Sequence, residues 1–526
     1  MPKCTINGVE LEVKEGTTII EAMKNNEQSI AHYCWHPGLS VAGVCRLCMV
    51  EIEGNPRLQI ACNTVVTEGM KVNNTSEKVK DAAKWGLDFH LINHPLDCPI
   101  CDQAGECGLQ DQYMEFGKYN PEMAEKKVKK HKVVDLGPTV VLDSERCILC
   151  SRCVRFTEEV TKTNELGIFN RGDHAEIGTH DGVELDNAYS LNTVDICPVG
   201  ALTAKDFRFR QRVWYLKDAP TVCTGCSTGC NVRVYFNKEG FFRAKPIYNP
   251  DVNGHWMSDS GRDFYKFVNR DARWLKGRRL GKNGWEELAP GAAAKEAGAV
   301  VKAGGSSVAL VLTGQYTSEE YETIIANFVS NVGTKNIFHW INNPESFEAF
   351  DGLLKRGDKN PNTKGLLSVL AQHGITAGWN DLVEGLKSKK IKTVVVAGPE
   401  NFFVFPDIEE KVKLLSQAEN LIWMQSTKNE FVEKLSSGNV WQIPMKSYLE
   451  KDGTFVNFKG LAQKIKKVTT IVNEALSLTD AAQLLTGQNL IFRAEPSTFV
   501  EVQKPQDRVT VETRKKNEFV FRRGSL

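Results

Sequence analysis

The cysteines of this chain lie in its N-terminal part, at spacings typical of metal ligands. The 526-residue sequence contains 15 cysteines, of which fourteen lie between residues 34 and 230 and none lies beyond. In a reducing compartment such clustering indicates metal binding rather than disulfide bonds. We therefore expect redox cofactors in the first 230 residues and no thiolate-bound cofactor in the remaining 296.

The first cysteine set has the spacing C-x10-C-x2-C-x13-C and consists of Cys34, Cys45, Cys48 and Cys62. Four thiolates suit a [2Fe–2S] or a [4Fe–4S] cluster, and they also suit a structural zinc ion. Gly38 and Gly43 lie in the long ligand loop, where glycine lets the backbone approach a cluster and donate N–H groups to its sulfur atoms. This loop and the small, β-rich module around it favour [2Fe–2S].

The second cysteine set pairs three cysteines with a histidine in the pattern H-x3-C-x2-C-x5-C. It consists of His94, Cys98, Cys101 and Cys107. A single histidine is more often a surface or core residue than a ligand. Here, however, three thiolates leave one iron of a [4Fe–4S] cubane open, and an imidazole four residues upstream can close it. Replacing a thiolate by neutral imidazole removes a negative charge and can raise the reduction potential.

The third cysteine set follows the ferredoxin pattern C-x2-C-x2-C, with a Cys-Pro after 43 further residues. It consists of Cys147, Cys150, Cys153 and Cys197. Two-cluster ferredoxins carry two copies of the pattern that exchange their fourth cysteine, whereas here the second copy provides only Cys197. One [4Fe–4S] cluster is therefore expected, and zinc fits this spacing poorly.

The elements expected to hold these ligands can be identified around each set. Alternating residues on either side of Gly8 predict a hairpin, and Thr18 with Glu21 has the spacing of a capping box at a helix start. Residues 77–95 predict a helix before the second set. The charged run at 122–135 is interpreted as a solvated linker or helix face.

Beyond residue 272, apolar strands alternate with helices, which predicts a parallel sheet covered on both faces. The segments are SSVALVLTG (306–314), SEEYETIIANFVSNV (318–332), KTVVVAGPE (392–400), NLIWMQ (420–425) and NLIFRA (489–494). A GGSS stretch precedes a strand instead of following one, so it is given no phosphate-binding role. The basic end, 508–526, is interpreted as a solvated tail, with docking to a neighbouring subunit as the alternative.

The charge balance excludes several classes of partner. Lys plus Arg is 66 and Asp plus Glu is 65, so no global field attracts nucleic acid or an anionic membrane. No run of 18 apolar residues is present, so no direct membrane span is expected. The opening, MPKCTINGVELEV, enters a strand pattern at once. We therefore expect no signal peptide, and a protein in the cytoplasm or on the cytoplasmic side of a membrane.

The first three sets, in this order, resemble the large iron–sulfur subunit (the G subunit) of respiratory complex I, the NADH:quinone oxidoreductase. The most specific elements are HPLDCPICDQAGECGLQD and CILCSRCVRF, and the match is strong up to about residue 272. The resemblance implies [2Fe–2S] at the first set and [4Fe–4S] at the second and third, with His94 as a ligand.

The same resemblance implies a role in electron transfer. Electrons would enter the first set from the flavin subunit that oxidises NADH, pass to the third and then the second, and leave for the downstream iron–sulfur and quinone-site subunits. This places the chain in the peripheral arm on the cytoplasmic side of the inner (cell) membrane. No substrate bond is made or broken there, so no residue is expected to be catalytic.

A fourth cysteine set departs from the family pattern at one position. Many bacterial relatives in that family carry an extra [4Fe–4S] cluster with the spacing C-x2-C-x3-C-x27-C. This chain has Cys223, Cys226 and Cys230 at that spacing, and then Ser258 in place of the last cysteine. Serine binds cluster iron more weakly than thiolate does, which leaves a serine-ligated cubane, a three-iron cluster, no cluster and a zinc site as alternatives. A bound cluster is favoured, because three thiolates at this spacing are otherwise hard to explain.

The resemblance also implies a multidomain α+β and α/β architecture. The expected parts are a β-grasp [2Fe–2S] ferredoxin-like domain (1–78), a helical [4Fe–4S] domain with one histidine and three cysteine ligands (79–135), a ferredoxin-type [4Fe–4S] domain (136–215), a degenerate [4Fe–4S] domain of molybdopterin-enzyme type (216–272) and a truncated molybdopterin-oxidoreductase-like scaffold (273–526). The stretch YLEKDGTFVNFKGLAQKI is similar to molybdopterin oxidoreductases. No molybdopterin is expected, because this part has no cysteine to bind molybdenum.

Other redox proteins use similar cluster modules. An iron-only hydrogenase needs further cysteines for its active cluster. A molybdenum formate dehydrogenase needs a cysteine or selenocysteine and a larger pterin domain. No cysteine follows residue 230, which disfavours both enzymes. The remaining alternative is a diaphorase subunit of a soluble NAD-linked hydrogenase or formate dehydrogenase. Such chains generally end near the third module, while this one continues for some 300 residues.

Overall fold

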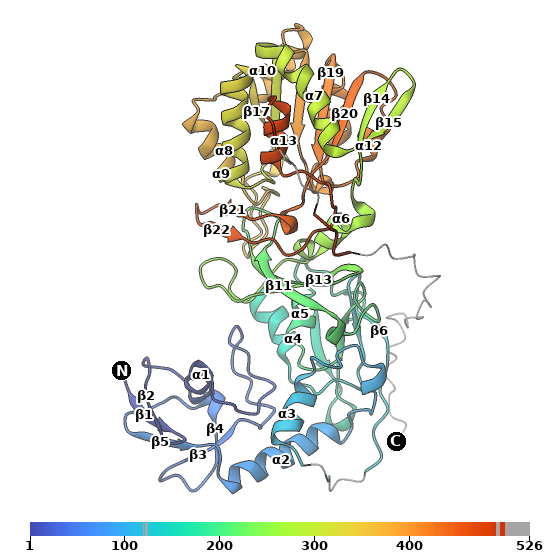
Figure 1. The fold of residues 1–526 in the computed structure, drawn as a ribbon. Helices are drawn as coiled ribbons and strands as arrows, with labels where there is room; N and C mark the ends of the chain where they lie inside the picture. Colours follow the sequence, from blue (N-terminus) through green and yellow to red (C-terminus); the bar gives the residue numbers. More distant parts are fainter. Residues whose placement is uncertain (119, 121–124, 491–494, 500–526) are drawn as a thin grey trace. The chain divides into compact units, whose positions relative to one another are not determined.

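The computed structural model describes residues 1–118, 120, 125–490 and 495–499 (Figure 1). The described residues form two compact units, the first within 1–215 and the second within 216–499. Each unit combines helices with more than one β-sheet, so the predicted multidomain α+β and α/β class is confirmed. The proposed division into five smaller domains stays a prediction.

The first unit begins with a five-stranded sheet in the order β2-β1-β5-β3-β4 and one helix. Its elements are β1 (Lys3–Ile6), β2 (Val9–Glu12), α1 (Ile19–Asn25), β3 (Met49–Ile52), β4 (Gln59–Ile60) and β5 (Met70–Asn73). The predicted hairpin is present, with Gly8 at a positive φ of 81° in its turn. Thr18 caps α1 in a capping box with Glu21, as its spacing predicts.

Helix α2 (Glu77–Leu91) leads to the second cysteine set and α3 (Gly108–Phe116) follows it. The sequence predicts helix up to residue 95, but the helix ends four residues earlier. The cause is Pro95, which disfavours helical backbone at the residue before it. His94 therefore lies in the loop after α2 and not on the helix itself.

The rest of the first unit holds the third cysteine set among short elements. They are β6 (Val134–Asp135), β7 (Val140–Leu142), α4 (Arg152–Arg155), β8 (Leu166–Phe169), β9 (Glu176–Thr179), α5 (Asn192–Asp195) and β10 (Leu202–Ala204). The charged run before them is only partly described, since 121–124 lie outside the described residues. Its Lys132 is not simply solvated, because it pairs with Asp97 at 2.5 Å and Glu145 at 2.8 Å.

The second unit begins with a three-stranded antiparallel sheet that carries the fourth cysteine set. Its strands are β11 (Lys217–Val222), β12 (Asn231–Asn237) and β13 (Gly240–Pro246), followed by α6 (Tyr265–Val268). A later hairpin, β21 (Gly453–Val456) with β22 (Ala462–Ile465), packs on the cysteine loop. The contact is direct, because the N–H of Phe458 donates to the Ser227 carbonyl at 2.9 Å.

The larger sheet of the second unit has seven strands in the order β15-β14-β20-β19-β18-β16-β17. They are β14 (Gly277–Gly281), β15 (Gly284–Leu288), β16 (Val308–Leu312), β17 (Ile337–His339), β18 (Thr393–Ala397), β19 (Asn420–Gln425) and β20 (Asn439–Pro444). Strands β16 to β20 run parallel, as the apolar sequences of β16, β18 and β19 predict, whereas β17 and β20 are not among the predicted strands. Strands β14 and β15 join at one edge in antiparallel orientation, so the sheet is mixed and not wholly parallel as predicted.

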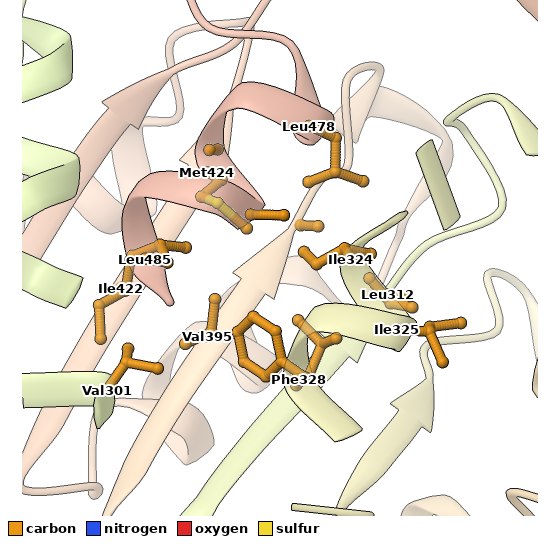
Figure 2. Packing of buried hydrophobic residues seen from close by; sticks show 14 of the residues in the cluster. Val301, Leu312, Ile324, Ile325, Phe328, Val395, Ile422, Met424, Leu478 and Leu485 are labelled. Carbon is orange, nitrogen blue, oxygen red and sulfur yellow. The ribbon is translucent and has the colours of Figure 1, made fainter. Parts of the chain in front are cut away.

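Two hydrophobic cores cover the two faces of this sheet. The helices are α7 (Pro290–Gly304), α8 (Ser318–Asn327), α9 (Thr363–Gln372), α10 (Trp379–Lys387), α11 (Ile408–Leu415), α12 (Glu430–Glu433) and α13 (Leu478–Leu485). Strand β18 contributes to both cores, because Val395 faces one and Val394 and Val396 face the other. Figure 2 shows the first core, where Phe328 and Val301 pack near Val395.

Two of the sequence predictions fall partly or wholly outside the described part of the chain. Residues 491–494 of the NLIFRA segment and the whole basic end at 508–526 lie outside the described residues. Among the helices that the structure does describe, none is long and apolar enough to cross a membrane.

The packing of the larger sheet yields a first prediction. Phe328 is 0% exposed in the core of Figure 2, so Phe328→Ala is expected to lower the free energy of unfolding by about 3–5 kcal/mol through lost burial and a cavity. Phe403→Ala is the matched control, because Phe403 is 66% exposed and its loss should change stability by at most about 0.5 kcal/mol. Urea unfolding of the full chain, followed by tryptophan fluorescence, measures both. Equal effects of the two substitutions would contradict this account of the core.

Candidate iron–sulfur sites

The first cysteine set lies in the loops of the N-terminal sheet, and all four of its thiols are buried, with the most exposed, Cys45, at 7%. Cys34 and Cys45 are hydrogen-bonded to each other, and so are Cys48 and Cys62. The hydrogen bond from Cys45 lowers the pKa of Cys34 to about 5, and the bond from Cys48 likewise lowers the pKa of Cys62. The N–H of Tyr33 also donates to Cys45 Sγ at 3.4 Å. The hydrogen bonds within the two cysteine pairs also raise the pKa of Cys45 and Cys48, so each pair stabilises one thiolate, the form in which cysteine binds iron.

The third cysteine set surrounds a small cavity of 20 Å³ that all four of its cysteines line. Burial raises the pKa of Cys147 to about 12 and that of Cys150 to about 11. The N–H of Leu149 donates to Cys147 Sγ at 3.4 Å, as backbone groups do around cluster sulfur. Leu149 and Ser151 adopt positive φ values of 54° and 60°, which bend the ligand loop around the cavity. Such buried thiols are neutral unless a metal centre takes them as thiolates.

The second cysteine set lines a larger cavity of 570 Å³, together with His94. Burial lowers the pKa of His94 to about 4, so its imidazole is neutral at physiological pH and suited to bind a metal. Its Nδ1 is buried and has no hydrogen-bond partner in the structure. Cys101 and Cys107 are buried, whereas Cys98 is exposed. An unpartnered imidazole nitrogen beside three thiols fits the predicted ligand set of one histidine and three cysteines.

The second and third sets are connected by direct backbone contacts. Gly200, which lies three residues after Cys197, touches Cys101 so closely that a Cβ atom there would collide with Cys101 Sγ. The N–H of Gly108 donates to the Pro198 carbonyl at 2.8 Å. Gly108 follows Cys107 of the second set and Pro198 follows Cys197 of the third, so this hydrogen bond joins the two ligand loops.

Ion pairs make a further connection between these two sets. Asp97, the residue before Cys98, pairs with Lys132 at 2.5 Å and with Arg146 at 3.1 Å. Arg146 is the residue before Cys147 and also lies 3.3 Å from Asp143. The ligand loops of the second and third sets are therefore fixed relative to each other by charged groups.

One hydrophobic core contains cysteines of all three sets. The members from the ligand sets are Cys34, Cys45, Cys107, Cys150 and Cys153, with Cys147 and Cys197 packed against them. Apolar residues of the first unit, such as Leu47, Leu87 and Leu142, fill the space between these cysteines. Cysteines of all three sets thus share one core, while Cys48 and Cys62 of the first set belong to the core of the N-terminal sheet.

The fourth cysteine set is buried in the second unit, with Cys223, Cys226 and Cys230 at most 7% exposed. Burial raises the pKa of Cys223 to about 12. The N–H of Gly225 donates to Cys223 Sγ at 3.4 Å. The close approach of the chain to this sulfur requires a glycine at 261, because a Cβ atom there would lie 2.8 Å from Cys223 Sγ.

Ser258 lies beside this set, as the sequence spacing predicts. Ser258 is 8% exposed. Gly261 lies close to both residues, because a Cβ atom added there would be 3.6 Å from Ser258 Oγ and 2.8 Å from Cys223 Sγ. The Oγ of Ser258 lies 3.3 Å from the Oγ of Ser260. Ser258 therefore lies near Cys223 of this set, while its role as a fourth ligand stays a prediction.

The burial, the thiolate-stabilising contacts and the cavities fit iron–sulfur clusters, while the ligand assignments stay predictions. Among the residues that the structure describes, no three His, Cys, Asp or Glu side chains are grouped closely enough to hold a single metal ion. The sequence analysis did not identify Gly200, which lies in the segment of the third set and contacts Cys101 of the second, or Tyr33, whose N–H donates to Cys45 within the first set. The only sequence signal for Gly200 is its position in the Cys-Pro-Val-Gly segment of the third set.

Three family models match the first unit. A 2Fe-2S iron-sulfur cluster binding domain matches residues 3–77, and an NADH-ubiquinone oxidoreductase-G iron-sulfur binding region matches 86–121. The ferredoxin-like domain of NADH-quinone oxidoreductase subunit 3 matches 137–203. The first three cysteine sets therefore lie within iron–sulfur cluster binding domains, as predicted.

Proteins with similar sequences are named as subunits of NADH-quinone and NADH-ubiquinone oxidoreductases. The NADH-quinone oxidoreductase G subunit of Rickettsia bellii is 35% identical over 340 residues, which are 64% of this chain and 49% of that protein. NADH dehydrogenase [ubiquinone] iron-sulfur protein 1, mitochondrial, of Solanum tuberosum is 40% identical over 267 residues, 50% of this chain and 36% of that protein. The chain thus spans about half the length, or less, of these curated relatives. The predicted resemblance to the large iron–sulfur subunit of complex I is confirmed over the matched residues.

A solved structure is also similar in part. The crystal structure of an NAD+-reducing [NiFe]-hydrogenase in the H2-reduced state has a chain that is 29% identical and has a TM-score of 0.37. The match covers 40% of this chain and 91% of that one.

The contact between Gly200 and Cys101 yields a second prediction. Gly200→Ala places a methyl group against Cys101 Sγ and 3.0 Å from Gln103 Cβ, so we expect loss of about four irons per chain and of one cubane signal. Gly291→Ala is the control, because a Cβ atom there meets nothing within 4 Å. Iron analysis and EPR of the reduced proteins measure the effect. An unchanged iron content in Gly200→Ala would contradict the placement of the second set's cluster beside Cys101.

Proposed function

We propose that this chain, a relative of the G subunits of the NADH-quinone oxidoreductases, is an electron-relay subunit of a complex I. It would conduct electrons from a flavin-containing, NADH-oxidising subunit toward quinone. The observation that carries this proposal is the single hydrophobic core shared by cysteines of the first three sets. Electron tunnelling needs redox centres held close together in a rigid, dry interior, and this core provides such an interior.

The first set would hold a [2Fe–2S] cluster, and the second and third sets would each hold a [4Fe–4S] cluster. When bound, these clusters supply one-electron redox chemistry. The chain's own residues hold them, exclude water from them and adjust their potentials through burial and N–H donors such as Tyr33 and Leu149. His94 would complete the second set as a neutral ligand, which favours a higher potential there than four thiolates would.

We also propose that the fourth set binds a cluster, with Ser258 beside its open position. Three buried thiols, an N–H donor to Cys223 and a glycine at 261 that makes room for the sulfur support this proposal. Two other segments of the same chain hold the cysteine loop in place. The N–H of Ser227 donates to the Asp358 carbonyl, and that of Phe458 donates to the Ser227 carbonyl, both at 2.9 Å.

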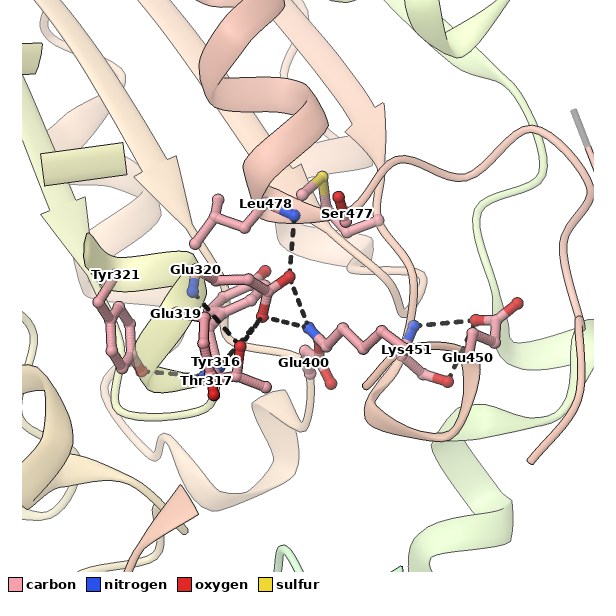
Figure 3. A network of polar contacts seen from close by, with 12 residues as sticks. Tyr316, Thr317, Glu319, Glu320, Tyr321, Glu400, Glu450, Lys451, Ser477 and Leu478 are labelled. Carbon is pink, nitrogen blue, oxygen red and sulfur yellow. Dashed lines mark hydrogen bonds and ion pairs between the residues drawn. The ribbon is translucent and has the colours of Figure 1, made fainter. Parts of the chain in front are cut away.

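The larger sheet of the second unit would act as a scaffold without molybdopterin. In open α/β sheets, ligands bind where the strand order reverses, outside the carboxyl ends of the strands. In the order β17-β16-β18-β19-β20 this point lies between β16 and β18. Figure 3 shows that side chains of the protein meet there, with Lys451 2.8 Å from Glu320 and 3.4 Å from Glu400.

These three side chains are buried, and their charges depend on one another. Burial raises the pKa of Glu400 to about 7, and the carboxylates of Glu320 and Glu400 raise the pKa of Lys451 against the effect of burial. Glu320 also accepts a hydrogen bond from the N–H of Leu478 at 2.9 Å. A crevice filled by its own ion pairs supports a structural role for this sheet.

The partners we propose follow from the two ends of the relay. The first set would receive electrons from the flavin subunit, and the second would pass them to the downstream iron–sulfur and quinone-site subunits. Around the second set Leu96 and Ile100 are exposed by 87% and 62%, next to the exposed Cys98, which supports a protein contact there. The chain would lie in the peripheral arm, on the cytoplasmic side of the membrane.

Iron analysis with EPR, on the purified chain reduced by dithionite, tests this function. We expect one [2Fe–2S] signal and two cubane signals from about 10 irons, and about 13 or 14 irons in total with the fourth cluster. Cys226→Ala should remove only the irons of the fourth set, because it lies in the other unit.

The outcomes separate the two parts of the proposal. A wild-type content near 10 irons that Cys226→Ala does not change would reject the fourth cluster alone. Far fewer irons, with zinc in their place, would reject the electron-relay function itself.

A further inference from the structure

Two arginines of the third set reach across to the ligand loop of the first set. Helix α4 (Arg152–Arg155) contains Cys153 and follows directly after Cys150 and Ser151. Arg152 donates from Nη2 to the Trp35 carbonyl at 2.6 Å and from Nη1 to the Ile196 carbonyl at 3.1 Å. Trp35 follows Cys34 of the first set and Ile196 precedes Cys197 of the third, so one guanidinium connects both ligand loops.

Arg155 makes an equivalent connection on the same helix. Its Nη2 donates to the Cys34 carbonyl at 2.5 Å and lies 3.5 Å from the Cys150 carbonyl, so it touches a ligand residue of each set. Its Nη1 donates to the Ser40 carbonyl, and its Nε donates to Ser151 Oγ at 3.2 Å. Arg155 is 8% exposed, which places its charge in the protein interior.

Neither guanidinium is neutralised by a carboxylate within the described part of the chain. Both donate to carbonyl and hydroxyl oxygens, and Arg152 Nε is buried without any partner. Glu159, farther along the chain, accepts a hydrogen bond from the N–H of Ser40 at 2.8 Å instead. Other buried arginines are paired, since Arg146 lies 3.1 Å from Asp97 and Arg273 lies 2.9 Å from Glu450.

Buried cations without counterions are costly unless another negative charge compensates them. Thiolates of both sets are in range: Arg152 interacts electrostatically with Cys150 and Cys197 of the third set and with Cys34 and Cys45 of the first. Clusters bound by four thiolates are negatively charged, and reduction adds one more negative charge. The two arginines are therefore placed to compensate the charge of both clusters at once.

We propose that Arg152 and Arg155 form a cationic bridge that raises the reduction potentials of the first and third clusters together. They are positioning residues for the electron transfer between these two sets, and this inference rests on the proposed function. No bond forms or breaks in that step. With both clusters bound, one electron would leave the cluster of the first set, which would be oxidised, and enter the cluster of the third set, which would be reduced.

The bridge makes the two sites depend on each other. A positive charge in the low-dielectric interior stabilises an added electron on either side, and much more strongly than a solvated charge does. Removing one arginine should therefore make both clusters harder to reduce. The second cluster, which the bridge does not contact, should change little.

Redox titration followed by EPR, on the full-length protein with its clusters bound, tests the bridge. We expect Arg152→Gln and Arg155→Gln each to weaken reduction of both clusters about tenfold, which lowers both midpoint potentials by about 59 mV. Arg46→Gln is the matched control, because Arg46 lies between Cys45 and Cys48 but is exposed to solvent. In this variant the midpoint potentials of both clusters should stay close to those of the wild type.

Arg152→Lys separates charge from packing. This variant keeps the positive charge, so the midpoint potentials of both clusters should return most of the way from the Arg152→Gln values to the wild-type values. A lysine would not rescue the loss of a merely structural contact. The bridge is rejected if the Gln variants shift the potentials no more than Arg46→Gln, if only one cluster responds, or if Arg152→Lys behaves like Arg152→Gln. Failure of the proposed function would give a different result, because the EPR spectrum of the wild-type protein would then lack the cluster signals altogether.

Discussion

Burial of most cysteine thiols in apolar cores is the constraint on which the rest of the first unit depends. Burial raises the pKa of thiols such as Cys147 and Cys150, so without metal these side chains are neutral, whereas iron would bind them as thiolates. One of these cores contains cysteines of three ligand sets that belong to different sequence modules. Under the proposed function, cluster binding and folding of this unit would be coupled, since the clusters would pack against this core.

Arg152 and Arg155 differ from the buried charges that carboxylates compensate, which occur in both units, as Arg146 with Asp97 shows for the first. In the second unit Arg273 and Lys451 are compensated by Glu450, Glu320 and Glu400, which lie within ion-pairing distance of them. In the first unit Arg152 and Arg155 have carbonyl partners but no carboxylate among the described residues. This contrast matches the functions that we propose for the two units. The second unit is closed by its own side chains, whereas the first leaves positive charge for negatively charged clusters.

Local features of this fold could be predicted from sequence, because they depend on neighbouring residues. Spacing alone indicated the four cysteine sets, the hairpin at Gly8, the capping box at Thr18 and the strand at 308–312. Contacts between distant segments could not be predicted in this way. Arg155 lies 121 residues from Cys34, and nothing in either segment shows that they meet. The contact of Gly200 with Cys101 is of the same kind. The early end of α2 is instead a local feature, because Pro95 outweighs the helical pattern next to it.

The central claim is that the first three sets form one packed relay, and magnetic coupling between reduced clusters tests it most directly. The measurement is EPR power saturation of the [2Fe–2S] signal in the full-length protein, first with that cluster alone reduced and then with the cubanes reduced as well. The account predicts faster relaxation and line broadening of the [2Fe–2S] signal once the cluster of the third set is also paramagnetic. A signal that saturates identically in both states would show that the clusters are far apart, and would contradict the single core as the path of the electrons.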